Sequence, residues 1–458
     1  MKNSFEIDMS EGRLFKKIIS FSIPLMISGI LQLAFNAADL IVVGRFAGEN
    51  SLAAVGSNGA LVSLIVNVLL GMGTGTSVLV SRYFGAKDET RLLDTVRTTV
   101  MIAVVGGIAF SVLGIAVSGW LLRLMGTPEG VLPLAEIYLR IYFAGLPVIV
   151  LYNFTSAALR AVGDSRRPLY FLAIAGVLNV GMNLFFVIVF HMDVAGVALA
   201  TVLSQCVSCF LTVRCLVRSK TICRLEMRPF RFSGEQFKEI VRIGLPAGIQ
   251  GSLFSVSNVL IQSSINSFGA MVMAGNSAAA SIESFLFVSQ DAMNQAAVAS
   301  VSQNMGARHY DRTRKAIRCC LLLTFSVSVI LSTCAMLLRR QLVGIYTSEP
   351  AAIDAGCVRL MVLGIFYFTN GIQHMLGGTM RGHGYSILPT CITLLGICGF
   401  RIVWLSTYFA SHRTLEVLYA SYPISWFITI FAQSICYFLL RKKAYAKNEL
   451  RYAAEHKI

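Results

Sequence analysis

Twelve long apolar runs, separated by short stretches of charged and turn-forming residues, dominate this 458-residue sequence. A helix of about 20 apolar residues is long enough to cross a bilayer, and in lipid the backbone must satisfy its own hydrogen bonds. Only 14% of the residues are charged, against about 25% in soluble domains. We therefore predict an all-α integral membrane protein with twelve transmembrane helices. Their approximate limits are 14–44, 52–80, 95–119, 136–158, 168–190, 194–216, 237–266, 274–303, 316–338, 356–378, 388–410 and 416–440.

Basic residues gather in the loops that follow even-numbered runs and in the C-terminal tail. Positively charged loops stay on the cytoplasmic side of a membrane, so we expect a multi-pass plasma-membrane protein with both termini in the cytoplasm. This orientation accounts for the net charge of +16, so the expected partner is the lipid bilayer and not nucleic acid. We predict an N-terminal six-helix lobe (1–216), a basic cytoplasmic linker (217–236), a C-terminal six-helix lobe (237–440) and a cytoplasmic tail (441–458).

The two halves of the chain are copies of one another. Pro24 near the start of the first half aligns with Pro246 in the second half, and Pro168 aligns with Pro389 in nearly the same register. Between these markers, FGA at 84–86 matches MGA at 305–307. Because each half has an even number of spans, both halves insert in the same orientation. The sequence therefore predicts two parallel six-helix repeats around a central cavity that rocking opens to either side.

The first apolar run carries a polar stripe. Gly29, Gln32, Asn36 and Asp39 recur at steps of three, four and three residues, so they share one face of a helix. A carboxylate at the centre of a bilayer costs about 2.5–3.5 kcal/mol or more, and such groups normally face a cavity or a partner. Asp39 is therefore the first functional candidate. The alternative is a carboxylate near the interface that is solvated and has no task.

Amide side chains in other spans are candidate companions of Asp39. Asn179 and Asn183 lie one helical turn apart in the fifth span, at a depth we expect to match that of Asp39. One carboxylate with several amide oxygens suits a small hard cation, so Asp39 is a candidate sodium site. Asn258 and Gln262 form a similar stripe in the seventh span. The alternative for Asn179 and Asn183 is that they only pack against neighbouring helices. The alternative for Asn258 and Gln262 is that they only form hydrogen bonds between helices.

Ionisable residues also lie within spans of the second half. Glu283 and Arg401 are expected at similar depth, where they would pair, because a lone buried charge is costly. Without that pair, Glu283 would be a second coupling or substrate-binding carboxylate. Asp291 lies nearer the cytoplasmic end of its span, so we expect it to be solvated. We expect His374 to be a hydrogen-bonded residue within its span. The eleven cysteines and six histidines do not form a metal site with recognisable ligand spacing.

Motifs for ATP hydrolysis and for common hydrolases are missing from the sequence. It has no G-x-x-x-x-G-K, no H-E-x-x-H and no G-x-S-x-G. GMGTGT at 71–76 lies inside the second span, where small residues allow helices to approach closely. We therefore expect a carrier driven by an ion gradient and not an enzyme.

Five segments of the sequence match one known family: IPLMISG at 23–29, SRYFGAKD at 81–88, ALRAVGDSRRP at 158–168, GLPAGIQ at 244–250 and SVSQNMGARHYDR at 300–312. They resemble segments of the multidrug and toxic-compound extrusion (MATE) transporters of bacteria. The resemblance implies a twelve-span antiporter that expels organic, often cationic, compounds in exchange for sodium ions or protons. Asp39 matches the acid of the family's first span. Asn179 matches the start of an N-x-x-x-D pattern in which Asn183 replaces the aspartate, and Phe254 stands where some sodium-coupled members have glutamate.

We therefore expect a secondary active exporter of organic, cationic compounds that works by alternating access. It should act as a monomer and need no cofactor beyond Na⁺ or H⁺. A flippase for lipid-linked precursors is the alternative transport function, for which Arg401 is the candidate cationic group. A membrane enzyme or receptor is a distant alternative. Expected cation-coupling residues are Asp39, Asn36, Asn179 and Asn183, and expected substrate-binding residues are Gln32, Asn58, Asn258, Gln262 and Glu283.

Overall fold

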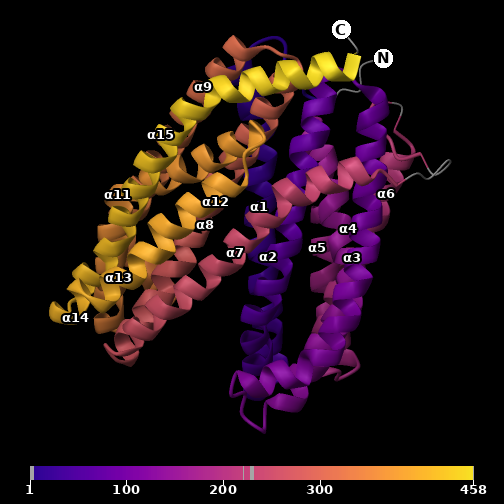
Figure 1. The fold of residues 1–458 in the computed structure, drawn as a ribbon. Helices are drawn as coiled ribbons and strands as arrows, with labels where there is room; N and C mark the ends of the chain where they lie inside the picture. The colour runs from indigo at the N-terminus through magenta and orange to yellow at the C-terminus, as the bar shows by residue number, and fades with distance from the viewer. Residues whose placement is uncertain (1–4, 220, 227–231, 457–458) are drawn as a thin grey trace. The chain divides into compact units, whose positions relative to one another are not determined.

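The structure is a computed structural model that describes residues 5–219, 221–226 and 232–456, and these contain helices and turns but no strand (Figure 1). Each of the twelve predicted spans falls on a helix or on consecutive helical segments, so the predicted all-α membrane fold is confirmed. The elements are α1 Leu14–Phe46, α2 Glu49–Ala86, α3 Glu89–Leu124, α4 Leu132–Ala161, α5 Arg166–Leu184, the π-helix η1 Phe185–Val189, α6 Asp193–Val217, α7 Gly234–Asn266, α8 Ala270–Gly306, α9 Tyr310–Leu337, α10 Arg339–Gly344, α11 Pro350–Gly382, α12 Ile387–Thr393, the π-helix η2 Leu394–Gly399, α13 Phe400–Ser406, α14 Tyr408–Ser411 and α15 Leu415–His456.

Eleven helical stretches within the described residues are long and apolar enough to cross a membrane. The exception among the predicted spans is the seventh, which forms the 33-residue helix α7. The polar stripe along α7 lowers its mean hydropathy, although its length of about 50 Å at 1.5 Å per residue is ample for a bilayer. The eleventh span is interrupted, because α12, η2, α13 and α14 follow one another within Ile387–Ser411.

The chain forms two compact units. Unit 1 contains the described residues of Met1–Asp8 and of Ile27–Gly248, and unit 2 contains Met9–Met26 and the described residues of Ile249–Ile458. The chain therefore passes from one unit to the other within α1 and again within α7. Pro24 and Pro246 lie just before these passages. The lobe limits at 1–216 and 237–440 stay a prediction.

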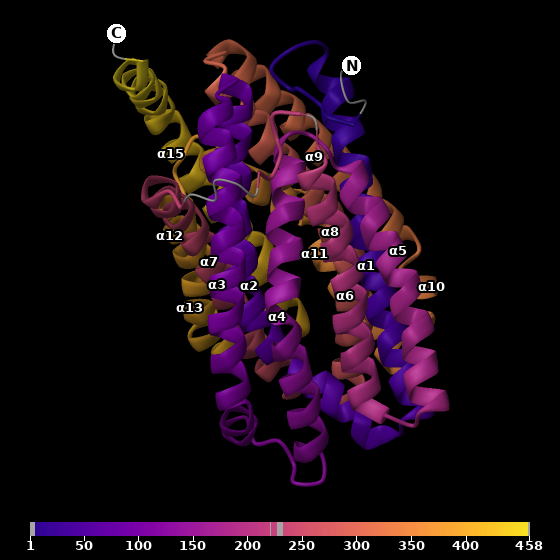
Figure 2. The same ribbon diagram turned by 90° about the vertical axis from the view of Figure 1, so that its right-hand side faces the viewer.

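In unit 1 the central helix is α4, which packs against α2, α3 and α6, while α5 packs against α6 (Figure 2). Its core consists of apolar side chains from α2, α3 and α4, among which Leu122, Leu139, Phe143 and Phe154 are fully buried. Large buried aromatic and aliphatic side chains supply most of the packing energy in such an interface.

In unit 2 the central helix is α11, which is the repeat counterpart of α4. It packs against α8, α9 and α15 (Figure 1). The core gathers apolar side chains from α8, α11 and α15, including Leu360, Leu418, Tyr419 and Trp426. The central helix and its neighbours thus correspond in the two units.

Backbone turns recur at the same places in both halves, in the register that aligns Pro168 with Pro389. Each pair has positive φ angles of nearly equal size, which glycine tolerates best. The pairs are Gly48 (87°) and Gly269 (94°) before α2 and α8, Lys87 (57°) and Arg308 (58°) after them, and Gly163 (88°) and Gly384 (90°) after α4 and α11. The internal repeat predicted from sequence is thus visible in the backbone itself.

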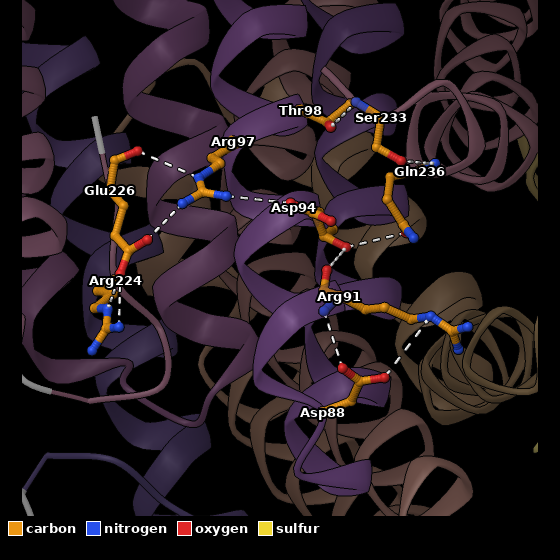
Figure 3. A network of polar contacts seen from close by, with 10 residues as sticks. Asp88, Arg91, Asp94, Arg97, Thr98, Arg224, Glu226, Ser233 and Gln236 are labelled. Atoms are coloured by element: carbon orange, nitrogen blue, oxygen red, sulfur yellow. Dashed lines mark hydrogen bonds and ion pairs between the residues drawn. The ribbon is translucent and has the colours of Figure 1, made fainter. Parts of the chain in front are cut away.

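Part of the basic segment predicted as a linker packs along α3 in unit 1 (Figure 3). Arg97 donates to Glu226 at 2.5 Å and to Asp94 at 3.3 Å, and the backbone N–H of Ser233 donates to Thr98 at 3.2 Å. The described part of the segment is therefore held by ion pairs and hydrogen bonds. Lys220, Arg228 and Arg231, which contribute to the basic pattern, lie outside the described residues.

Candidate functional site

A close contact between α1 and α5 in unit 1 positions the candidate coupling residues. The Phe35 ring of α1 lies over Gly176 of α5, where a Cβ atom would come within 1.8 Å of the ring. Only glycine allows such an approach. Asp39 follows Phe35 by one helical turn, and Asn179 and Asn183 follow Gly176 by one and two turns, so this contact places all three polar side chains in register.

Within this contact, Asn183 donates its Nδ2 hydrogen to Asp39 Oδ1. The same nitrogen lies 3.3 Å from Asn179 Oδ1, and the Asn179 amide nitrogen lies 3.4 Å from Thr201 Oγ1 on α6. Asn183 is fully buried and Asn179 is 5% exposed. The structure therefore brings together three of the four residues predicted for cation coupling.

Asn183 Oδ1 is a buried oxygen without a hydrogen-bond partner among the described residues. Buried acceptors are nearly always satisfied, so this atom is available to a ligand. Together with the Asp39 carboxylate it offers oxygen donors of the kind that hard cations bind. The π-helix η1 begins shortly after Asn183, and π-helical segments often mark functional sites. The residues present fit a sodium ion, and Asp39 equally fits a proton.

The other predicted residues of the first half take different positions. Asn36 and Gln32 are exposed on α1. Asn58 is fully buried and donates to the carbonyl oxygen of Ala135 at 3.0 Å, so its amide nitrogen ties α2 to α4. That contact occupies the Nδ2 group of a residue that we predicted to bind substrate.

Glu283 pairs with Arg359 and not with Arg401, which corrects the sequence prediction. Arg359 Nε and Nη2 reach the two carboxylate oxygens of Glu283 at 2.8 and 2.7 Å. The side chains are 8% and 12% exposed. Arg401 instead lies 3.9 Å from the centroid of the Tyr422 ring and donates to Ser425 at 3.3 Å. Similar depth in the membrane does not tell which helices are neighbours, so it suggested the wrong arginine. Helix α8 packs directly against α11, which carries Arg359.

A chain of amides extends from this ion pair. Arg359 Nη1 donates to Asn276 Oδ1 at 2.5 Å, and Asn276 Nδ2 donates to Gln262 Oε1 at 3.2 Å. Gln262 in turn donates to Asn266 at 2.9 Å. Asn258 is exposed on the same helix. Glu283 and Gln262 thus belong to one hydrogen-bonded network inside unit 2.

The sequence did not reveal that Asp291 of α8 lies beside His374 of α11. Asp291 Oδ1 and His374 Nε2 are 3.4 Å apart, and Gln295 donates to Asp291 Oδ2 at 2.7 Å. We predicted a solvated Asp291 and a hydrogen-bonded His374, without connecting them. The available signal was the presence of one ionisable residue within each of two spans.

The comparisons with known proteins match this architecture over nearly the whole chain. A family model described as MatE matches residues 24–185 and 246–405, one segment in each repeat. The chain belongs to the MatE family. Membership makes this MATE protein a member of a multidrug efflux transporter family and not an enzyme, as predicted.

Two relatives of this MATE protein come from Bacillus subtilis (strain 168). The probable multidrug resistance protein YpnP is 29% identical over 85% of this chain and 87% of its own length. The probable multidrug resistance protein YoeA is 27% identical over 92% and 93%. A multidrug resistance MATE family transporter of the MOP superfamily, solved in an outward-facing conformation, has the same fold, with a TM-score of 0.87, 23% identity and full coverage of both chains.

Proposed function

We propose that this protein exports organic cations across the plasma membrane in exchange for Na⁺ or H⁺ by alternating access. The observation that carries the proposal is the Asp39–Asn183 contact, with an unpartnered amide oxygen beside a carboxylate inside membrane-spanning helices. A carboxylate in that setting favours binding of a cation, since its desolvation is costly until a positive charge joins it. The names of the two Bacillus relatives support multidrug substrates.

In this proposal Asp39 holds the coupling cation, and Asn183 orients the carboxylate through its Nδ2–H group while offering Oδ1 as a ligand. Asn179 fixes the Asn183 amide, and the exposed Asn36 completes the site when the cation is bound. Coupling ion and substrate favour different arrangements of the protein, so binding of one drives release of the other. Both termini lie in the cytoplasm, and the protein acts as a monomer.

Substrate contacts are assigned to the exposed polar side chains Gln32 and Asn258 and to Gln262. Arg359 already occupies both carboxylate oxygens of Glu283. The flippase alternative gains no support from Arg359 and Arg401. These arginines are 6% and 5% exposed, and each already has a described partner.

The proposal is tested with purified protein in liposomes, using ethidium as the transported cation under a sodium gradient and a pH gradient imposed separately. The wild type should move ethidium under one gradient, and Asp39→Asn should lower that driven flux. We expect a loss of at least about tenfold, which corresponds to a typical coupling free energy. Asp354→Asn is the matched control, because Asp354 is 61% exposed and pairs with Arg340 at the surface. Equal driven flux in wild type and Asp39→Asn would remove Asp39 from the coupling mechanism.

A further inference from the structure

Asp291, His374 and Phe287 form a cluster on α8 and α11, wholly within unit 2. The Asp291 carboxylate accepts from Gln295 at 2.7 Å and lies 3.4 Å from His374 Nε2. The His374 ring lies 5.4 Å from the Phe287 ring, which is one helical turn before Asp291. The His374 imidazole therefore has a carboxylate on one side and an aromatic ring next to it. The cation-coupling cluster at Asp39 uses none of these residues.

The cluster is open to a ligand. The Asp291 side chain is 41% exposed and that of His374 is 18% exposed, while Phe287 is 43% exposed. Helix α8 continues beyond Asp291 to Gly306, which is a distance of about 22 Å along the helix. An exposed carboxylate at such a position faces water and not lipid, because a charge against hydrocarbon is too costly.

We propose that Asp291, Phe287 and His374 bind the positively charged group of the exported organic cation. The inference rests on the proposed function and assigns its substrate a site. Carboxylates attract organic cations through charge, and aromatic faces attract them through their ring quadrupoles. Glu283, two turns earlier on α8, cannot serve in the same way, because Arg359 neutralises both of its oxygens.

The repeat supplies an internal comparison for the site. In the register that aligns Pro168 with Pro389, Leu70 and Asn153 of unit 1 correspond to Asp291 and His374. Both line a small pocket between α2 and α4. The same place in the two units thus holds an apolar hollow in one and a carboxylate–imidazole pair in the other. His374→Asn is the substitution that this comparison recommends, because Asn153 occupies the position in unit 1.

The test measures equilibrium binding of ethidium to the purified full-length protein in detergent, by fluorescence anisotropy. At about pH 8, Asp291→Asn should weaken binding by about tenfold or more, the effect of losing a contact with a charged group. Asp354→Asn removes a surface carboxylate from the same unit and should leave binding unchanged.

A second variant provides the second arm. His374→Asn should also weaken ethidium binding, because it removes the aromatic ring beside the Asp291 carboxylate. The proposal is overturned if Asp291→Asn binds ethidium as the wild type does, or if Asp354→Asn loses as much affinity. Should Asp291→Asn fail to fold, unchanged ethidium binding by His374→Asn overturns it instead.

The two proposals fail in different ways. Asp39→Asn should lose gradient-driven transport while still binding ethidium, and Asp291→Asn should lose binding itself. If the protein binds ethidium through Asp291 but moves none under either gradient, the exporter proposal fails and the binding site stands. If ethidium is transported with Asp291→Asn at the wild-type affinity, the site fails and the exporter stands.

Discussion

The two units share a backbone plan but place their polar chemistry at different positions. Unit 1 has an acid–amide cluster between α1 and α5. Its counterparts in unit 2 are apolar, because Ile261 aligns with Asp39, and Phe400 and Trp404 align with Asn179 and Asn183. Ile261 is 1% exposed and belongs to the core of unit 2. The repeat has thus kept its turns and packing while only one copy has a polar site here.

The reverse holds between α8 and α11 of unit 2. Glu283 and Arg359 form a buried ion pair, whereas Val62 and Tyr138 stand at the corresponding positions of unit 1 and pack against its core. Buried polar groups are usually hydrogen-bonded or paired, and the two units supply such partners at different places. The comparison teaches that symmetry predicts the scaffold of this protein and not its sites.

The largest expected effect concerns the ion pair of unit 2. Arg359→Gln should lower the free energy of unfolding by about 3–5 kcal/mol, because Glu283 is left buried without its cation. Thermal and denaturant unfolding in detergent would measure this. Replacing both partners with leucine should recover much of the loss. Arg340→Gln, which breaks an exposed pair with Asp354, should cost less than about 1 kcal/mol, and a similar loss in the two arginine variants would contradict the distinction.

A smaller effect is expected at the close contact of unit 1. In Gly176→Ala, the new methyl group would overlap the Phe35 ring, which should cost about 1–3 kcal/mol and displace Asp39 from Asn183. Gly181 lies on the same helix with nothing within 4 Å of its Cβ position, so Gly181→Ala is the matched control. Unfolding and the ion dependence of ethidium flux are both measurable. Identical behaviour of the two alanine variants would show that the α1–α5 contact does not position the site.

The smallest effect tests whether Arg97 of α3 holds the described part of the predicted linker against unit 1. Cys223 is 1% exposed, and burial raises the pKa of its thiol. Arg97→Gln removes the bonds to Glu226 and Asp94, which are worth about 1 kcal/mol at this exposure. Alkylation of Cys223, followed by peptide mass spectrometry, should then be roughly fivefold faster, since local opening is favoured by that amount. Arg242→Gln should leave the rate unchanged; equal rates in both variants would refute docking through Arg97.

How far the sequence predicts this protein depends on whether a feature is local. Apolar runs set the helices, and matched prolines and glycines set the repeat, because these depend on neighbouring residues alone. The grouping of Asp39 with Asn183 followed from depth and helical phase, and the structure brings them together. The roles assigned to them remain predictions.

Partner choice across helices was beyond the reach of the sequence. Depth made Glu283 and Arg401 equivalent candidates for a pair, but the rotation of each helix about its axis decides which side chains meet. That rotation depends on the packing of α8 against α11, in which Glu283 pairs with Arg359 and Asp291 lies beside His374. Each of these contacts joins residues that are far apart along the chain, so no local pattern encodes it.

The division of α1 and α7 between the units also bears on biosynthesis. Unit 1 includes the described residues of 221–248, which leave the ribosome after the first six spans, and unit 2 includes Met9–Met26, which leave it at the start. Neither unit can reach its final set of contacts while only half of the chain has been inserted. The first half must therefore wait in the membrane, its first helix incompletely packed, until the second half has been translated.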